Sequence, residues 1–197
     1  MRAGANGGLA FALACLLLSA GGCEGDEEPL PRLSTVPEFA LTSHTGKPFT
    51  RADMNGHVWV ANFIFTSCPD VCPLLTKKMA DLRLGLVRKG APVHFLSFSV
   101  DPDTDTPAVL KAYAQERAAL HDDWEFVTGP IDAVKEVIAE GFHQRMERDP
   151  DEPANVFHGS HFVLVDQHGA IRGYYRSEHE GLLELSRDAA RLAGEGS

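Results

Sequence analysis

Hydrophobic and polar positions along residues 37–195 predict alternating strands and helices. Four apolar runs rich in β-branched and aromatic residues predict buried strands, and they are His57–Phe65, Val93–Val100, Trp124–Thr128 and His161–Asp166. A turn at Gln167–Gly169 joins the last of these to a further strand, Ala170–Tyr175. Before them, Phe39–Lys47 predicts a short hairpin that turns near Gly46.

Helical spacing of apolar residues marks four other segments. They are Leu74–Lys89, Asp105–Ala119, Ile131–Glu140 and Gly181–Leu192. Pro107 is well placed at the first position of the second helix. Because strands and helices alternate, we predict an α/β domain with a mixed central sheet, helices on both faces and an N-terminal β-hairpin.

The first 22 residues have the pattern of a secretory signal. Arg2 precedes an apolar run, Leu9–Leu18, and small residues follow the run up to Cys23. The run of about ten residues is short for a bilayer span. We therefore expect residues 1–22 to be a signal peptide and the domain to be exported.

Cys23 follows small residues, as the lipidated cysteine of a bacterial lipoprotein does. Ala20 stands where that motif usually has leucine. We expect lipidation at Cys23, with ordinary signal cleavage or a retained anchor as alternatives. Residues 23–36 are acidic and contain prolines, which predicts a flexible tether between this anchor and the domain at 37–195.

Composition sets limits on the partners. Hydrophobic residues make up 44% of the 197 residues, as in an ordinary globular protein, and the formal net charge is −10 with a pI near 5.3. An acidic chain without a basic cluster argues against binding to nucleic acid or to an anionic lipid surface.

Only two cysteines belong to the predicted domain. Cys15 falls in the apolar run of the leader and Cys23 has its own explanation, so Cys68 and Cys72 can pair only with each other. If this stretch opens a helix, residues i and i+4 lie on one face with Cα atoms roughly 6 Å apart, within reach of a disulfide. A helix N-terminus also favours thiolate over thiol. The pair can form a disulfide or hold a soft metal ion.

Acidic residues lie near both ends of this region. Asp70, between the thiols, either tunes their charge or favours the start of the helix. The run Asp101–Asp105 lacks the glycine and the terminal glutamate of a calcium loop. We therefore assign it to capping of the helix that Pro107 begins.

Three sequence segments resemble the Sco/SenC family of copper-handling proteins. They are Thr66–Pro73, with the string CPDVCP, then Ser99–Pro107 and His158–Asp166. The resemblance covers about residues 36–192 and implies a thioredoxin-like fold, with the dithiol where the first long strand meets a helix. It also implies one copper ion bound by Cys68, Cys72 and a histidine eight residues before Asp166, which is His158. His161 is the rival third ligand.

The same resemblance implies a function. Such proteins are associated with supplying copper to the binuclear site of cytochrome c oxidase subunit II, or with reducing the cysteines of that site. We expect a metallochaperone for Cu(I), and also Cu(II), that faces the periplasm of a bacterial envelope. An upstream copper donor and a thiol reductant would serve it. The alternative is a thiol-disulfide reductase that uses Cys68 and Cys72 as a redox-active disulfide. A purely structural disulfide, a peroxidase and a zinc site fit the residues less well.

Overall fold

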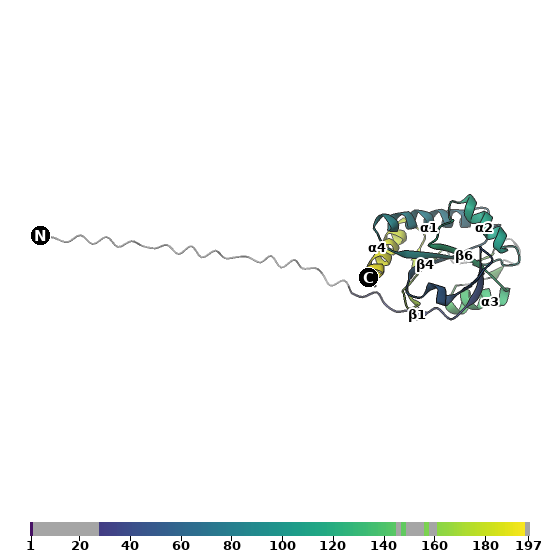
Figure 1. The fold of residues 1–197 in the computed structure, drawn as a ribbon, viewed down its shortest axis with the longest axis horizontal. Coiled ribbons are helices and arrows are strands. Elements are labelled where there is room, and N and C mark those ends of the chain that lie inside the picture. Colours follow the sequence, from purple (N-terminus) through teal and green to yellow (C-terminus); the bar gives the residue numbers. More distant parts are fainter. Residues whose placement is uncertain (2–27, 145–146, 149–155, 158–160, 196–197) are drawn as a thin grey trace.

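An eight-stranded sheet forms the centre of the protein (Figure 1). The computed structural model describes residues 1, 28–144, 147–148, 156–157 and 161–195. In sheet order the strands are β1 (Ser34–Thr35), β10 (Ala170–Arg176), β9 (His161–Val165), β4 (Val58–Ile64), β5 (Val93–Ser99), β6 (Trp124–Thr128), β2 (Ala40–Ser43) and β3 (Pro48–Thr50). Two short strands, β7 (Glu147–Arg148) and β8 (Val156–Phe157), pair with each other.

Parallel and antiparallel pairs both occur in the sheet. β4, β5 and β6 run parallel, while β9, β10 and β1 on one side and β2 and β3 on the other pair antiparallel. All seven residues of β4 are buried, as expected of a central strand covered on both faces. β2 and β3 form the predicted hairpin, and Gly46 in its turn has φ +79°, a conformation that favours glycine.

Helices cover both faces of the sheet, which confirms the predicted layers. On one side lie α1 (Val71–Arg88), α2 (Pro107–Glu116) and α4 (His179–Glu195), and Figure 1 shows α3 (Ile131–Lys135) on the side opposite α1. A one-turn 3₁₀ helix, η1 (Arg51–Met54), follows β3, and a π-helix, η2 (Glu136–Gly141), continues α3.

Aromatic side chains fill the two layers between helices and sheet. Phe142, just after η2, contacts Trp59, Phe63 and Phe98, with ring centroids 5.2–6.0 Å apart. On the other face, Trp124 and Phe126 stack on each other and Tyr113 of α2 packs against Phe126.

The structure differs from the sequence prediction at residues 34–36, which we placed in the tether. Leu33 N and Val36 N donate to the carbonyls of Ile171 and Gly169, each at 2.9 Å, and Val36 is buried. This pairing uses backbone groups, so a strand of two residues leaves almost no side-chain pattern to detect.

Two helix predictions also change. α1 begins at Val71, three residues before the predicted start, and the predicted helix at 131–140 is α-helical only to Lys135 and then π-helical. Within the part of the chain that the structure describes, no helix combines the length and the apolar character needed to cross a bilayer.

Candidate metal centre

The two cysteines lie where β4 runs into α1, at the carboxyl end of the parallel strands. Cys68 is in the turn before α1, whereas Cys72 is the second residue of the helix. The two therefore do not share one helix face, contrary to the simplest prediction from their spacing. Cys72 N nevertheless donates to Cys68 Sγ at 3.3 Å, so the connecting turn brings the two thiol-bearing residues together.

Both thiols are buried, with 9% of Cys68 and none of Cys72 exposed. Burial raises the pKa of Cys72 far above its usual value, and this outweighs the hydrogen bond that Phe65 N donates to its Sγ at 3.5 Å. The expectation that the helix N-terminus favours a thiolate is therefore wrong for Cys72. Burial therefore favours the neutral thiol at Cys72.

A buried carboxylate, Asp105, supports the turn that carries Cys68. It accepts hydrogen bonds from Thr66 N at 3.2 Å, from Thr66 Oγ1, and from Ser99 Oγ at 2.6 Å. No part of Asp105 is exposed, and this burial raises the pKa of its carboxyl group despite the three donors. These bonds join the end of β4 to the end of β5.

Our assignment of the 101–105 run to helix capping is wrong for Asp105. The N-cap of α2 is Thr106, whose Oγ1 accepts from Val109 N at 3.4 Å. Asp105 instead faces the turn before the dithiol. Sequence analysis missed it because an aspartate just before a helix is most often a cap, and its partner Thr66 lies 39 residues away.

Thr76 and Tyr113 form the inner wall behind Cys72. Thr76 Oγ1 donates to Cys72 O at 2.9 Å and is 2.9 Å from Tyr113 Oη. Burial raises the pKa of Tyr113 to about 12, so the phenol stays protonated. The Arg117 guanidinium lies over the Tyr113 ring, 3.9 Å from its centroid. A threonine and a tyrosine on two helices have no spacing that would reveal this contact in a sequence.

The other predicted site residues are only partly accounted for. Asp70 is exposed at the N-cap of α1 and its side chain makes no capping hydrogen bond. His161 is half-buried at the first position of β9. His158 and Cys23 lie outside the described residues. Among the described residues, no three histidine, cysteine or acidic side chains are grouped to hold a metal ion.

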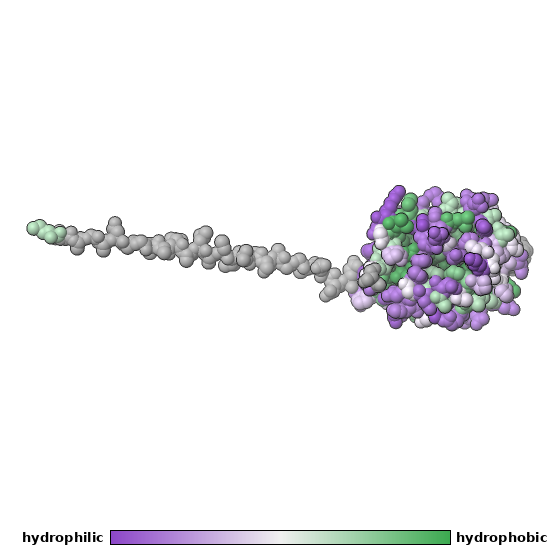
Figure 2. All heavy atoms as spheres, in the orientation of Figure 1, coloured by the Kyte–Doolittle hydropathy of each residue, from purple (hydrophilic) through white to green (hydrophobic). Residues whose placement is uncertain are grey.

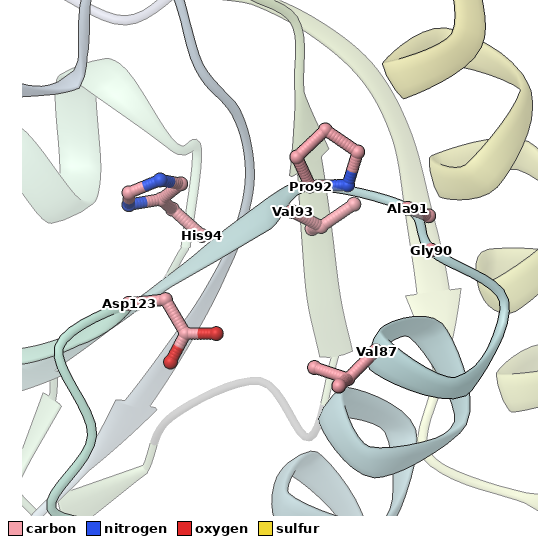
Figure 3. A pocket seen from close by; sticks show the side chains of 7 residues that line it. All are labelled: Val87, Gly90, Ala91, Pro92, Val93, His94 and Asp123. Carbon is pink, nitrogen blue, oxygen red and sulfur yellow. The ribbon is translucent and has the colours of Figure 1, made fainter.

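A cavity of about 340 Å³ lies at the amino ends of β4 and β5, away from the dithiol (Figure 3). His94 and Asp123 line it, and the His94 ring lies against that of His57, tilted by 33°, with centroids 3.9 Å apart. Burial, helped by the neighbouring His57, lowers the pKa of His94. Asp123 is paired with Arg83 at 2.6 Å. These residues do not extend the dithiol site.

A buried dithiol between a central strand and the following helix, in a mixed sheet covered on both faces, defines a thioredoxin-like domain. Comparison with known proteins gives the particular family. SCO1/SenC matches residues 27–192, and this chain belongs to the SCO1/SenC family.

Relatives of the chain extend over nearly its whole length. It is 33% identical over 193 residues to the SCO1 protein homolog of Bacillus subtilis (strain 168), which covers 96% of this chain and 97% of the relative. The crystal structure of a SCO1/SenC family lipoprotein from Bacillus anthracis str. Ames is 34% identical, with a TM-score of 0.75 over 81% of this chain and 95% of that one.

Two further solved structures concern a disulfide switch and bound copper. BsSco, a member of the Sco family of cytochrome c oxidase assembly proteins in which a disulfide switch was identified, is 30% identical (TM-score 0.75, covering 84% of this chain and 97% of that one). Yeast Sco1, solved with copper bound, is 26% identical (TM-score 0.65, covering 79% and 88%). Sco relatives thus include copper-bound proteins and proteins of oxidase assembly.

Proposed function

We propose that this chain is a copper metallochaperone that binds one copper ion through Cys68, Cys72 and His158 and delivers it to a cuproenzyme. The target we propose is the binuclear copper site of cytochrome c oxidase subunit II. The observation that carries the proposal is the buried pair of thiols, joined by the hydrogen bond from Cys72 N to Cys68 Sγ, in a chain of the SCO1/SenC family. Thiolates are soft ligands that suit Cu(I), and an added imidazole also accommodates Cu(II).

The surroundings of the thiols suit a copper ion that is bound and later released. Because Cys72 is neutral when no metal is bound, copper binding releases a proton and proton uptake favours release. Three ligands leave a coordination position at which a target ligand can enter. Thiol-by-thiol exchange with the cysteines of the target then transfers the ion.

The register of β9 supports a third ligand from the segment just before it. Val163 lies opposite Ala61 of β4, so His161 is displaced toward the dithiol end of the sheet. His158 precedes His161 by three residues, a span of at most about 10 Å.

A copper titration tests the ligand set. The full chain, purified in mild detergent and reduced, is compared with Cys68→Ser, Cys72→Ser, His158→Ala and His161→Ala. We expect one ion per chain, and a loss of affinity of at least about a hundredfold for the first three variants. His161→Ala serves as the matched control and should bind like the wild type.

Two results would contradict this ligand set. If His161→Ala loses affinity and His158→Ala does not, His161 is the third ligand. If the wild-type protein binds no copper while its thiols are reduced, the metallochaperone proposal is wrong.

A second role, reduction of the target's cysteines, is supported by the two adjacent thiols and by the disulfide switch in BsSco. Cys68, the more exposed thiol, would attack the target disulfide to give a mixed disulfide and release one target thiolate. Cys72 would then attack Cys68, forming the Cys68–Cys72 disulfide and releasing the second target thiol. A thiol reductant must restore the pair. Cys72→Ser should trap the mixed disulfide, visible by mass spectrometry, whereas Cys68→Ser should not.

We also propose that the domain faces the periplasm from a lipid anchor at Cys23. The resemblance to the SCO1/SenC family lipoprotein of Bacillus anthracis supports this location. Mass spectrometry of the protein from membranes should find a diacylated Cys23 as its first residue. A mature protein without lipid would contradict the anchor.

A further inference from the structure

Two histidine rings meet at the end of the sheet opposite the dithiol. His57 immediately precedes β4 and His94 is the second residue of β5, and their ring centroids are 3.9 Å apart. The thiols lie beyond the other end of β4, and the seven residues of that strand span about 20 Å. The two histidines are therefore a separate pair of metal-binding side chains, which the proposed function does not use.

The backbone holds both histidines on one face of the sheet. In the parallel register of β4 and β5, Trp59 lies opposite His94. Side chains two residues apart in an extended chain share a face, so His57 lies on the face of Trp59 and His94. His57 N donates to Met54 O at 3.2 Å, and β5 is paired on both sides, with β4 and with β6. Binding of a ligand by these side chains therefore requires little ordering of the backbone.

The separation of the two rings suits two bonds to one metal ion. Metal–nitrogen bonds to histidine are about 2.0–2.1 Å long, so two nitrogens on one ion lie about 2.9 Å apart at a right angle and about 3.4 Å apart in a tetrahedron. The separation of the ring centroids exceeds these values by only about 0.5–1 Å. Because the rings turn about their side-chain bonds, a small rotation brings one nitrogen of each ring to a shared ion.

Room for such an ion lies beside His94. The cavity of about 340 Å³ at this end of the sheet is lined by His94 (Figure 3). A water molecule occupies about 30 Å³, so the cavity can hold a metal ion together with several water molecules as its further ligands. His57 and His94 are both half-buried, which leaves part of each ring within reach of an ion from solvent.

The type of donor atom, rather than charge, selects the ion. Hydrophilic residues spread over much of the face of the domain that Figure 2 shows, so polarity alone singles out no site there. Asp123, which shares the cavity with His94, is paired with Arg83 at 2.6 Å, and the two charges compensate each other. Imidazole nitrogen suits zinc, copper and nickel, whereas magnesium and calcium prefer oxygen ligands. Among the first-row divalent ions, affinity is highest for Cu²⁺.

We propose that His57 and His94 form a second metal site, which takes a divalent transition-metal ion and binds Cu²⁺ most tightly. One nitrogen of each ring binds the ion, and water molecules in the cavity complete its coordination. The bound ion links the start of β4 to the start of β5. None of the residues assigned to copper delivery takes part, so this site is independent of the proposed function.

Titration of the full chain with Cu²⁺, in mild detergent, tests the site. The background is Cys68→Ser/Cys72→Ser/His158→Ala, which removes the ligand set proposed above. We expect this background to bind one Cu²⁺ per chain, more tightly than it binds Ni²⁺ or Zn²⁺. An equal concentration of Mg²⁺ should not displace the copper, because the ligands are nitrogens.

Three variants of this background identify the ligands. His57→Gln and His94→Gln should each weaken Cu²⁺ binding by at least about tenfold, because the second nitrogen no longer binds within the same molecule. His179→Gln is the matched control, since His179 is exposed at the start of α4, and it should bind like the background. Electron paramagnetic resonance of the bound Cu²⁺ should show two imidazole nitrogens in the background and fewer in the first two variants.

Several results would overturn the proposal. They are an affinity like that of the background in both His57→Gln and His94→Gln, an equal loss in His179→Gln, displacement of the copper by Mg²⁺, and no binding by the background. Urea unfolding without metal checks that each variant is folded. His57 lies outside β4, so His57→Gln tests the site even if His94→Gln does not fold.

Discussion

Replacement of Asp105 by alanine tests whether this buried carboxylate holds the dithiol turn. The change removes the acceptor of Thr66 N, Thr66 Oγ1 and Ser99 Oγ. Each buried donor left without an acceptor costs about 1–3 kcal/mol. Burying the carboxylate is itself unfavourable, as its raised pKa shows, and this offsets part of the loss. We therefore expect Asp105→Ala to lower the free energy of unfolding by about 3 kcal/mol.

Urea unfolding of the reduced protein, followed by tryptophan fluorescence, measures the effect. Asp105→Asn keeps the shape and one acceptor oxygen, so it should lose about half as much. Asp103→Ala, an exposed change in the same loop, is the control and should cost less than about 0.5 kcal/mol. A loss below about 1 kcal/mol for Asp105→Ala would refute the reasoning, because the three donors would then have found other partners.

Three further predictions follow from contacts described above or from neighbouring ones. Phe142→Ala should lower stability by about 3–5 kcal/mol, measured by thermal unfolding, because its buried ring packs between three aromatic side chains. The pKa of Asp166 is lowered, because hydrogen bonds from Ala170 N, His168 N and Arg172 outweigh its burial. Its contribution to stability is therefore present above about pH 4 and lost as the pH falls further, so the deficit of Asp166→Asn should shrink in acid urea titrations. Under the proposed ligand set, copper affinity should rise by at least about tenfold per pH unit around neutrality, because binding would displace at least the proton of Cys72.

Each of these predictions has a result that would contradict it. Val87→Ala, an exposed truncation on α1, is the control for Phe142→Ala and should change the melting temperature by less than about 2 °C. If both variants lower the melting temperature equally, the packing of Phe142 is not the cause of the loss. A deficit for Asp166→Asn that stays constant from neutral to acid pH would contradict the linkage. An affinity for copper that is flat between pH 6 and 8 would mean that the ligands are already deprotonated.

Sequence patterns predict the layers of this fold well because burial enforces them. β4 is buried at every position, and its run Val58–Ile64 is apolar except for Asn62, while the hairpin turn at Gly46 needs a residue that adopts positive φ. β1 and η2 escaped prediction for a physical reason. A strand of two residues is set by backbone pairing, and a π-helix differs from an α-helix in hydrogen bonds rather than in apolar spacing.

The site was predictable in its chemistry and less so in its surroundings. The spacing of Cys68 and Cys72 identified the dithiol, but the raised pKa of Cys72 depends on how deeply the fold buries it. Asp105, in the loop before α2, and Tyr113, in α2, reach the site through contacts between distant parts of the sequence. Local patterns contain no record of such contacts.

The short strand β1 and the residues just before it also tie the amino-terminal part of the described chain to one end of the sheet. Ser34 and Thr35 pair with Ile171 and Ala170 at the start of β10, at the end of the sheet away from the carboxyl end of β4. Upstream of β1, Arg191 donates to the carbonyl of Glu28 and Arg172 to those of Leu30 and Pro31, so a load applied at residue 28 meets these side-chain contacts before it reaches β1. If the proposed anchor acts through this edge, the end of the sheet with the dithiol would face away from the point of attachment.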